Sequence, residues 1–89
     1  MNVKVIIRAS VSPTEKGLDD LKFAASALTS NQDSIVVEMQ EENDQFLLIA
    51  SFEMKATAQY KVVDHISKEF ELSLVNLKGY QDMCISFPQ

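Results

Sequence analysis

Apolar and polar side chains alternate with a period of two over residues 3–9. One set of positions is entirely apolar, from Val3 to Ala9, and the other set holds Lys4, Ile6 and Arg8. This period is typical of a β-strand that buries one of its faces. The first element predicted by the pattern is therefore a strand.

A helix is expected directly after this strand. Ser12 is followed by Pro13 and then by Glu15, which predicts a capping box with proline at the first helical position. The helix should run to about Thr29, because the apolar residues of this stretch fall on one arc of its surface. These residues are Leu18, Leu21, Ala24, Ala25 and Leu28.

A β-hairpin is expected in the middle of the chain. Residues 35–40 and 46–54 both alternate, and Asn43-Asp44 between them suits a tight turn because both side chains tolerate positive φ. A two-residue turn at this point brings apolar residues of the two strands together on one face, so pattern and turn predict the same register. The expected pairs are Ile35 with Phe52, Val37 with Ala50, and Met39 with Leu48.

The remaining sequence predicts a second helix and a last strand. The helix should span about Thr57 to Glu71, and the strand residues 83–87. Residues 72–81 between them are harder to assign, because four apolar side chains precede Lys78-Gly79, a turn signal. We expect an ordered connection there, with room for a short extra edge strand.

The order strand, helix, strand, strand, helix, strand predicts a ferredoxin-like α+β sandwich. Two right-handed crossovers would place both helices on one face of a four-stranded antiparallel sheet, with the first and third strands in the centre. A chain of 89 residues has room for one domain, so residues 1–89 are expected to form a single unit.

The sheet face without helices is expected to carry an apolar patch. Alternation places Ile6, Leu47 and Ile49 on the two central strands of that face, with Val36 beside them. Such a patch favours association, although β-branched residues are also common in strands through propensity alone. Because symmetric self-association is common, we expect a homodimer with the sheets packed face to face, and a different protein partner is the other possibility.

Phe23 is a second candidate contact residue. At about 100° per residue it lies on the far side of the first helix from Leu21 and Leu28, among charged neighbours. An aromatic ring in that position could anchor a partner protein, or it could pack under a terminus or loop.

The loop before the first helix is a candidate anion site. Free N–H groups at a helix N-terminus, with the Ser10 and Ser12 hydroxyls and Arg8 nearby, could hold a small anion. The competing interpretation is that Ser12 only caps the helix and Arg8 is only a solvated strand residue.

Composition argues against nucleic acid and membrane as partners. The chain has 8 basic and 13 acidic residues, a net charge of −5, whereas binding to a phosphate backbone needs clustered Lys and Arg. No apolar run is long enough to cross a membrane, and residues 1–10 do not have the pattern of a signal peptide. A single cysteine, Cys84, excludes an internal disulfide and favours a reducing compartment, so we expect a cytoplasmic protein.

No pattern in the sequence predicts catalysis. His65 is the sole histidine and has Glu69 one helical turn away, which is typical of a surface pair. The acidic residues from Glu38 to Asp44 lack the spacing of a calcium loop. Tyr60 and Tyr80 could line a pocket, although both also suit half-buried positions. We therefore expect no catalytic residue, no metal site and no cofactor.

Several functions of ferredoxin-like domains lack the residues they need. An RNA-recognition surface stacks bases on aromatic side chains, but the matching positions hold Ile6, Leu47, Ile49 and Ser51. The first loop has no CxxC pair, and a phosphate-binding loop is excluded because Gly17 and Gly79 are the only glycines.

From Val3 to Ile66 the pattern of elements resembles small dimeric α+β barrel proteins such as the antibiotic-biosynthesis monooxygenases. It is also similar to amino-acid-binding ACT modules. The sequence departs from the first group in its aromatic content and motif residues, and from the second in lacking a glycine in the first loop. No site residue is carried over from either group.

The sequence thus favours a non-catalytic, self-associating module that binds a partner protein or senses a small ligand. The alternative is a small cofactor-free enzyme of the dimeric α+β barrel type. An enclosed polar pocket near His65, Tyr60 or Arg8 would favour the enzyme, whereas a filled core beside a flat apolar sheet face would favour the module.

Overall fold

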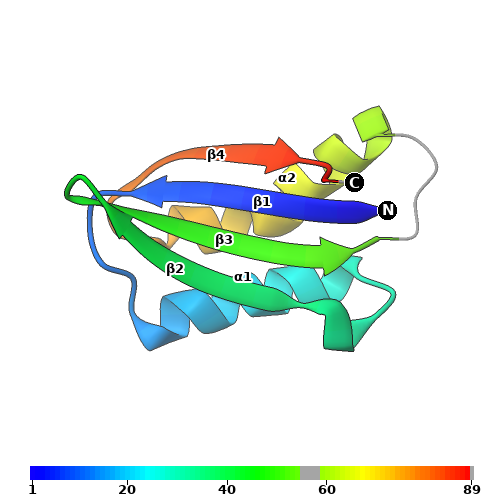
Figure 1. Cartoon of the computed structure of the whole chain (residues 1–89), viewed down its shortest axis with the longest axis horizontal. Helices are drawn as coiled ribbons and strands as arrows, with labels where there is room; N and C mark the ends of the chain where they lie inside the picture. Colours follow the sequence, from blue (N-terminus) through cyan, green and yellow to red (C-terminus); the bar gives the residue numbers. More distant parts are fainter. Residues whose placement is uncertain (55–58, 89) are drawn as a thin grey trace.

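β1 (Asn2–Ala9) is a central strand, paired with β3 (Gln45–Glu53) on one side and with β4 (Tyr80–Ser86) on the other. β2 (Val36–Glu42) pairs with β3, so the antiparallel sheet has the order β2-β3-β1-β4. Helices α1 (Glu15–Leu28) and α2 (Gln59–Val75) both lie behind the sheet (Figure 1). The computed structural model, which describes residues 1–54 and 59–88, has the expected ferredoxin-like βαββαβ arrangement.

The hydrophobic core fills the space between the sheet and the helices. β1 shows the alternation directly, because Val3, Val5, Ile7 and Ala9 are each at most 1% exposed while the residues between them are not. Phe52 of β3 and Phe70 of α2 stack at the centre, with ring centroids 6.4 Å apart. The other fully buried large side chains are Leu21, Leu48 and Ile66.

The β2–β3 hairpin confirms the predicted turn and register. Asn43 and Asp44 have φ values of 50° and 63°, the left-handed conformation that a two-residue type I′ turn requires at both positions. Val37 lies opposite Ala50, and Met39 lies opposite Leu48, as expected. Ile35 immediately precedes β2 and packs against the core.

The predicted start of the first helix was wrong by two residues. Thr14, not Ser12, is the N-cap, and its hydroxyl accepts a hydrogen bond of 3.1 Å from the Gly17 N–H. Ser10 still donates its N–H to the carbonyl of Gly79, 2.9 Å away, at the edge of the sheet. The residues after Ser10 are therefore needed to carry the chain from the sheet layer to the helix layer, about 10 Å away at roughly 3.5 Å per residue.

The second helix continues beyond its predicted end at Glu71 and stops at Val75. Leu74 and Leu77 extend the buried stripe that contains Phe70, with exposed fractions of 9% and 8%. Two exposed apolar residues in the same stretch, Leu72 and Val75, obscured this stripe in the sequence. The predicted start at Thr57 lies outside the described residues.

The last strand begins earlier than predicted, at Tyr80 instead of Met83. Gly79 has a φ of 78° and turns the chain from α2 into β4. Its lack of a side chain is required, because a Cβ there would lie 2.8 Å from the Val11 side chain. No additional edge strand is present between residues 72 and 79.

Candidate functional site

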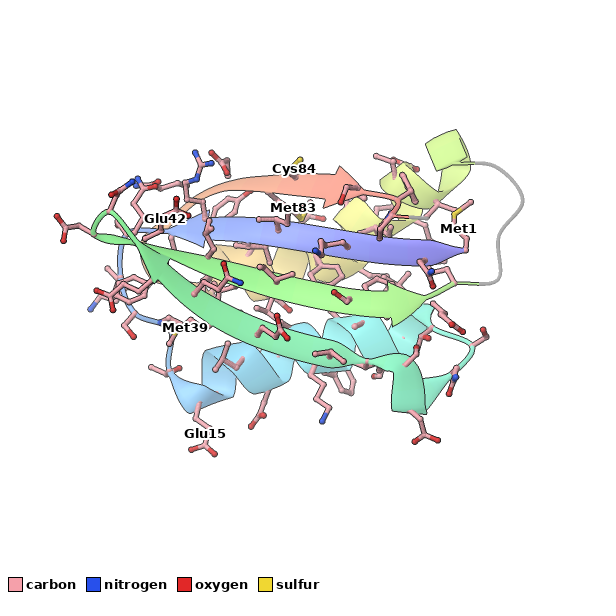
Figure 2. The ribbon with its side chains drawn as sticks, in the orientation of Figure 1. Met1, Glu15, Met39, Glu42, Met83 and Cys84 are labelled. Atoms are coloured by element: carbon pink, nitrogen blue, oxygen red, sulfur yellow. The ribbon has the colours of Figure 1, made fainter. Side chains whose placement is uncertain are left out.

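One face of the sheet carries no helix and is called the open face below. It is the face turned towards the viewer in Figure 2, where Cys84 marks β4. The strand register arranges its side chains in rows that cross the strands from β2 to β4. The three central rows are Val36, Ser51, Lys4 and Ser86; then Glu38, Ile49, Ile6 and Cys84; then Gln40, Leu47, Arg8 and Asp82. Glu53 and Asn2 lie beyond the first row, and Glu42 and Gln45 lie beyond the third.

The predicted apolar residues come together at the centre of the open face. Ile6 and Ile49 are direct cross-strand partners, and Leu47 lies one row away on the same strand as Ile49. Ile49 is only 9% exposed, although it contributes nothing to the core on the helix side. Val36, at the β2 edge, is 48% exposed. The structure therefore brings four of the five candidate contact residues onto one surface.

Charged residues surround this apolar centre. Arg8 and Asp82 form a cross-strand ion pair in the row next to Ile6, and Arg8 Nη1 lies 3.4 Å from Asp82 Oδ2. About half of each side chain remains exposed, so the pair contributes little to the stability of the monomer. Asp82 was missed in the sequence because the last strand was expected to start one residue after it.

The only cysteine of the sequence also lies on the open face. Cys84 is a free, exposed thiol in the same row as Ile6. Cys84 alternates along β4 with Met83, which packs against the core, and Figure 2 shows the two residues as neighbours on that strand. The thiol is therefore a single site at which this surface can be labelled chemically.

A hollow of about 280 Å³ lies at the hairpin end of the open face, lined by Arg8, Glu42, Asn43, Gln45 and Leu47. Figure 2 places Glu42 at this end of the sheet. Gln45 also donates a hydrogen bond of 3.1 Å to the side chain of Gln81 across the sheet. The hollow is polar and lies beside the apolar centre.

The three residues of the candidate anion site do not converge. Arg8 lies on the open face, whereas Ser12 lines a separate hollow of about 370 Å³ beside the start of α1. The Ser10 hydroxyl donates to the Gly79 carbonyl, 3.4 Å away. The expectation that Ser12 caps the helix was also wrong, because Thr14 does so.

Phe23 is exposed, as its helical position predicted, but it lies on the helix side of the molecule. Its side chain is 77% exposed and lines a hollow with Leu72 of α2, which is 76% exposed. Neither a terminus nor a loop within the described residues covers the ring. Phe23 is thus separate from the open face, and Leu72 is a neighbour that the sequence did not reveal.

The remaining candidate chemistry stays on the surface. His65 Nε2 lies 3.8 Å from Glu69 Oε1, with 59% of the histidine side chain exposed, as expected for a surface pair. Within residues 1–54 and 62–88, no three His, Cys, Asp or Glu side chains are grouped in a way that could hold a metal ion. Tyr80 is 39% exposed, and the Tyr60 side chain lies outside the described part of the chain. Neither helix, as far as it is described, is long and apolar enough to span a membrane.

Comparisons with known proteins identify no family for this chain. No protein-family model and no curated protein sequence matches the chain. Among solved structures, the chain is similar to a putative antibiotic biosynthesis monooxygenase from Chloroflexus aurantiacus J-10-fl, with 8% identity and a TM-score of 0.44. The alignment covers 100% of this chain and 94% of that one. At this identity and TM-score the likeness supports no conclusion about this chain, and it transfers no residue role.

Proposed function

We propose that this protein is a small self-associating module that forms a homodimer through the open face of its sheet. The observation that carries the proposal is the position of Ile6, Leu47 and Ile49 at the centre of a face that no helix covers. Apolar side chains gathered at the centre of an exposed face are typical of an interaction surface.

The size of the face supports a dimer of moderate affinity. Four strands spaced about 4.8 Å apart, each about seven residues long, present on the order of 450 Å² in projection. Specific interfaces usually bury about 800 Å² per partner, so a pair of open faces lies near the lower end of the range. We therefore expect the dimer to dissociate on dilution.

The described residues favour the module over a small cofactor-free enzyme. The side chains between sheet and helices form one continuous buried cluster. The hollows near Arg8 and Ser12 lie at the surface instead of within this cluster. A filled core beside an apolar sheet face supports the self-associating module, because an enzyme of this size would need an enclosed pocket.

The role of the dimer would be to present a partner-binding or ligand-sensing surface, and we place the protein in the cytoplasm. An exposed free thiol on the open face of the monomer is suited to a reducing compartment, where it is not oxidised. The hollow beside Arg8 would adjoin the edge of the proposed interface.

The test is the solution mass, measured by light scattering behind size exclusion over a concentration series. We expect a mass near twice 10.0 kDa at high concentration, falling towards one copy on dilution. Ile49→Lys should give a monomer at all concentrations, because it buries an unpaired charge in the interface. Val36→Lys provides the same test at a position that is already 48% exposed, where the fold of the monomer tolerates lysine.

Leu72→Lys is the matched control, since it makes the same kind of change on the exposed helix side. This variant should retain the mass of the wild type, and circular dichroism should show all three variants folded. A dimer that survives both open-face substitutions but dissociates with Leu72→Lys would place the interface on the helices and overturn the proposal.

A further inference from the structure

In its three central rows the open face carries two charged residues that are in no ion pair in the monomer, while two further carboxylates, Glu53 and Glu42, lie beyond these rows at the ends of the sheet. Arg8 and Asp82 pair with each other, but Lys4 and Glu38 form no ion pair with any residue that the structure describes. If this face packs on a second copy, both charges lose water, and a charge buried without a partner is strongly unfavourable. In the dimer, the other copy must therefore place an oppositely charged side chain beside each of these two residues.

Lys4 and Glu38 occupy positions that are approximately mirror images of each other across a diagonal of the open face. Neighbouring strands are about 4.8 Å apart, and successive rows on one face are about 6.8 Å apart along the strands. Glu38 lies on the edge strand β2 in the central row, and Lys4 lies on β1 in the row that contains Val36. On these spacings, reflection across the diagonal from Val36 to Asp82 exchanges Lys4 with Glu38 to within about 3 Å.

A two-fold axis that lies in the plane of the interface along this diagonal would bring these two positions of different copies together. Each residue then faces the partner residue that occupies its mirror position about the axis. With the axis along the diagonal, Lys4 faces Glu38 of the partner subunit, and Glu38 faces Lys4 of the partner subunit. Ile6 and Ile49 remain at the centre, and Val36 meets Val36 of the partner subunit at one corner.

The opposite corner is also compatible with this arrangement. Asp82 would approach Asp82 of the partner subunit there, but each carboxylate keeps the Arg8 with which it already pairs. The two arginines then flank the two carboxylates at the rim, where solvent remains close, so the positive and negative charges of this corner balance.

Other two-fold arrangements pair the charges less well. An axis parallel to the strands sets Lys4 against Ser51 of the partner subunit and Glu38 against Cys84 of the partner subunit, so neither charge is compensated. An axis perpendicular to the strands sets Lys4 against Arg8 of the partner subunit, and brings the two copies of Glu38 together. Like charges placed opposite each other suppress such an arrangement.

The second diagonal leaves a different charge unpaired. It places Glu38 against Arg8 of the partner subunit, but Lys4 then faces Cys84 of the partner subunit. Asp82 would also leave its arginine and face an apolar corner. The diagonal from Val36 to Asp82 is thus the arrangement in which every charge of the three central rows has a counter-charge, while Glu53 and Glu42 lie beyond the overlap of the two faces.

From this we infer that the second copy docks with its strands crossed at roughly a right angle, one of the two common sheet-on-sheet geometries. Reciprocal ion pairs between Lys4 and Glu38, on either side of the apolar centre, fix this crossing and select the partner. The inference rests on the proposed function, since it specifies the geometry of the same interface.

Charge reversal tests the pairing. Lys4→Glu and Glu38→Lys should each weaken the dimer by about 5–30-fold in Kd, because each places like charges at both symmetric contacts. The double variant Lys4→Glu, Glu38→Lys restores opposite charges and should return the Kd to within about threefold of the wild type. Glu71→Lys on the exposed side of α2 is the control for net charge, and it should leave the Kd unchanged.

Cross-linking tests the crossing angle independently. In the inferred geometry the two copies of Val36 face each other, while the two copies of Cys84 lie about 10 Å apart along the face. Val36→Cys in a Cys84→Ser background should therefore form a covalent dimer rapidly with a short bis-maleimide. The wild type, which carries only Cys84, should cross-link more slowly under the same conditions.

The outcomes separate the inference from the proposed function. If Ile49→Lys dissociates the dimer but the two charge reversals act additively in the double variant, the open face is the interface and the crossed arrangement is wrong. Faster cross-linking through Cys84 than through Val36→Cys also overturns the crossing. A wild-type monomer at every concentration overturns both the inference and the proposed function.

Discussion

The two faces of β1 show how one strand can serve two different purposes. On the helix side every residue from Val3 to Ala9 is apolar and at most 1% exposed. On the open side Ile6 stands between Lys4 and Arg8 and is only half-buried. The helices of the same chain cover the helix-side face, whereas the open face of the monomer is in contact with solvent.

The two faces contribute differently to the stability of the monomer. Residues on the helix side lose all their contact with water when the chain folds, so they supply most of the hydrophobic stabilisation. Residues on the open side gain only part of that stabilisation in the monomer. Any further gain at Ile6 requires a second surface, and this makes the two faces separable by experiment.

The largest expected effect comes from comparing two adjacent residues of β1. Ile7→Ala should lower the free energy of unfolding by about 2–5 kcal/mol, because it leaves a cavity in the core. Ile6→Ala should cost only about 1 kcal/mol in a dilute sample, because its side chain is already partly hydrated. Urea denaturation followed by circular dichroism measures both values, and equal losses would show that the faces are not distinct in the monomer.

The next effect concerns protein concentration. The unfolding free energy of the wild type should rise by about 1 kcal/mol when the concentration increases from near the Kd to a hundredfold above it, because the free monomer then falls from about half to about one fifteenth of the protein. The same series with Ile49→Lys should be flat, because that variant has no dimer to stabilise it. A rise of equal size in both proteins would mean that association does not involve the open face.

A smaller effect is expected at Cys84. Its exposed thiol should react with a chromogenic disulfide reagent about fivefold more slowly when the protein is concentrated to ten times the Kd, because most copies are then paired. Ile49→Lys should show one rate at all concentrations. A wild-type rate that does not change with concentration would place Cys84 outside the interface.

The smallest effect is expected at the Arg8–Asp82 pair. Arg8→Gln should change the stability of the dilute monomer by about 0.2–1 kcal/mol, because both side chains are half exposed. The loss should shrink further in 1 M salt, which screens exposed charges. A loss above 2 kcal/mol by urea denaturation would indicate that Arg8 has a structural role on this face.

The parts of the fold that the sequence predicted are those set by alternation and by local turn chemistry. The hairpin is one example, because Asn43-Asp44 and the flanking strands agreed on one register. The composition of the open face is another, since a strand with one buried face fixes what lies on the other. Both features depend on residues close together in the sequence.

The parts that the sequence did not predict depend on tertiary contacts. Arg8 and Asp82 are paired although 74 positions separate them, and no local pattern connects them. The C-terminal end of α2 was missed because Leu72 is exposed and interrupts the amphipathic pattern. The anion site failed for a different reason, since the alternation of β1 directs Arg8 onto the open face, whereas Ser12 lies in the loop beside the start of α1.

The ends of the sheet also determine how the chain could be reconnected. β1 starts and β4 ends next to each other, since Lys4 pairs with Ser86, and both lie at the end of the sheet opposite the Asn43-Asp44 turn (Figure 1). A short peptide could therefore join the termini while new ends are opened at the turn, which would leave both faces of the sheet in place. In such a circular permutant β2 and β3 become the most distant strands in sequence, so their pairing changes from the fastest local event to the slowest step of folding.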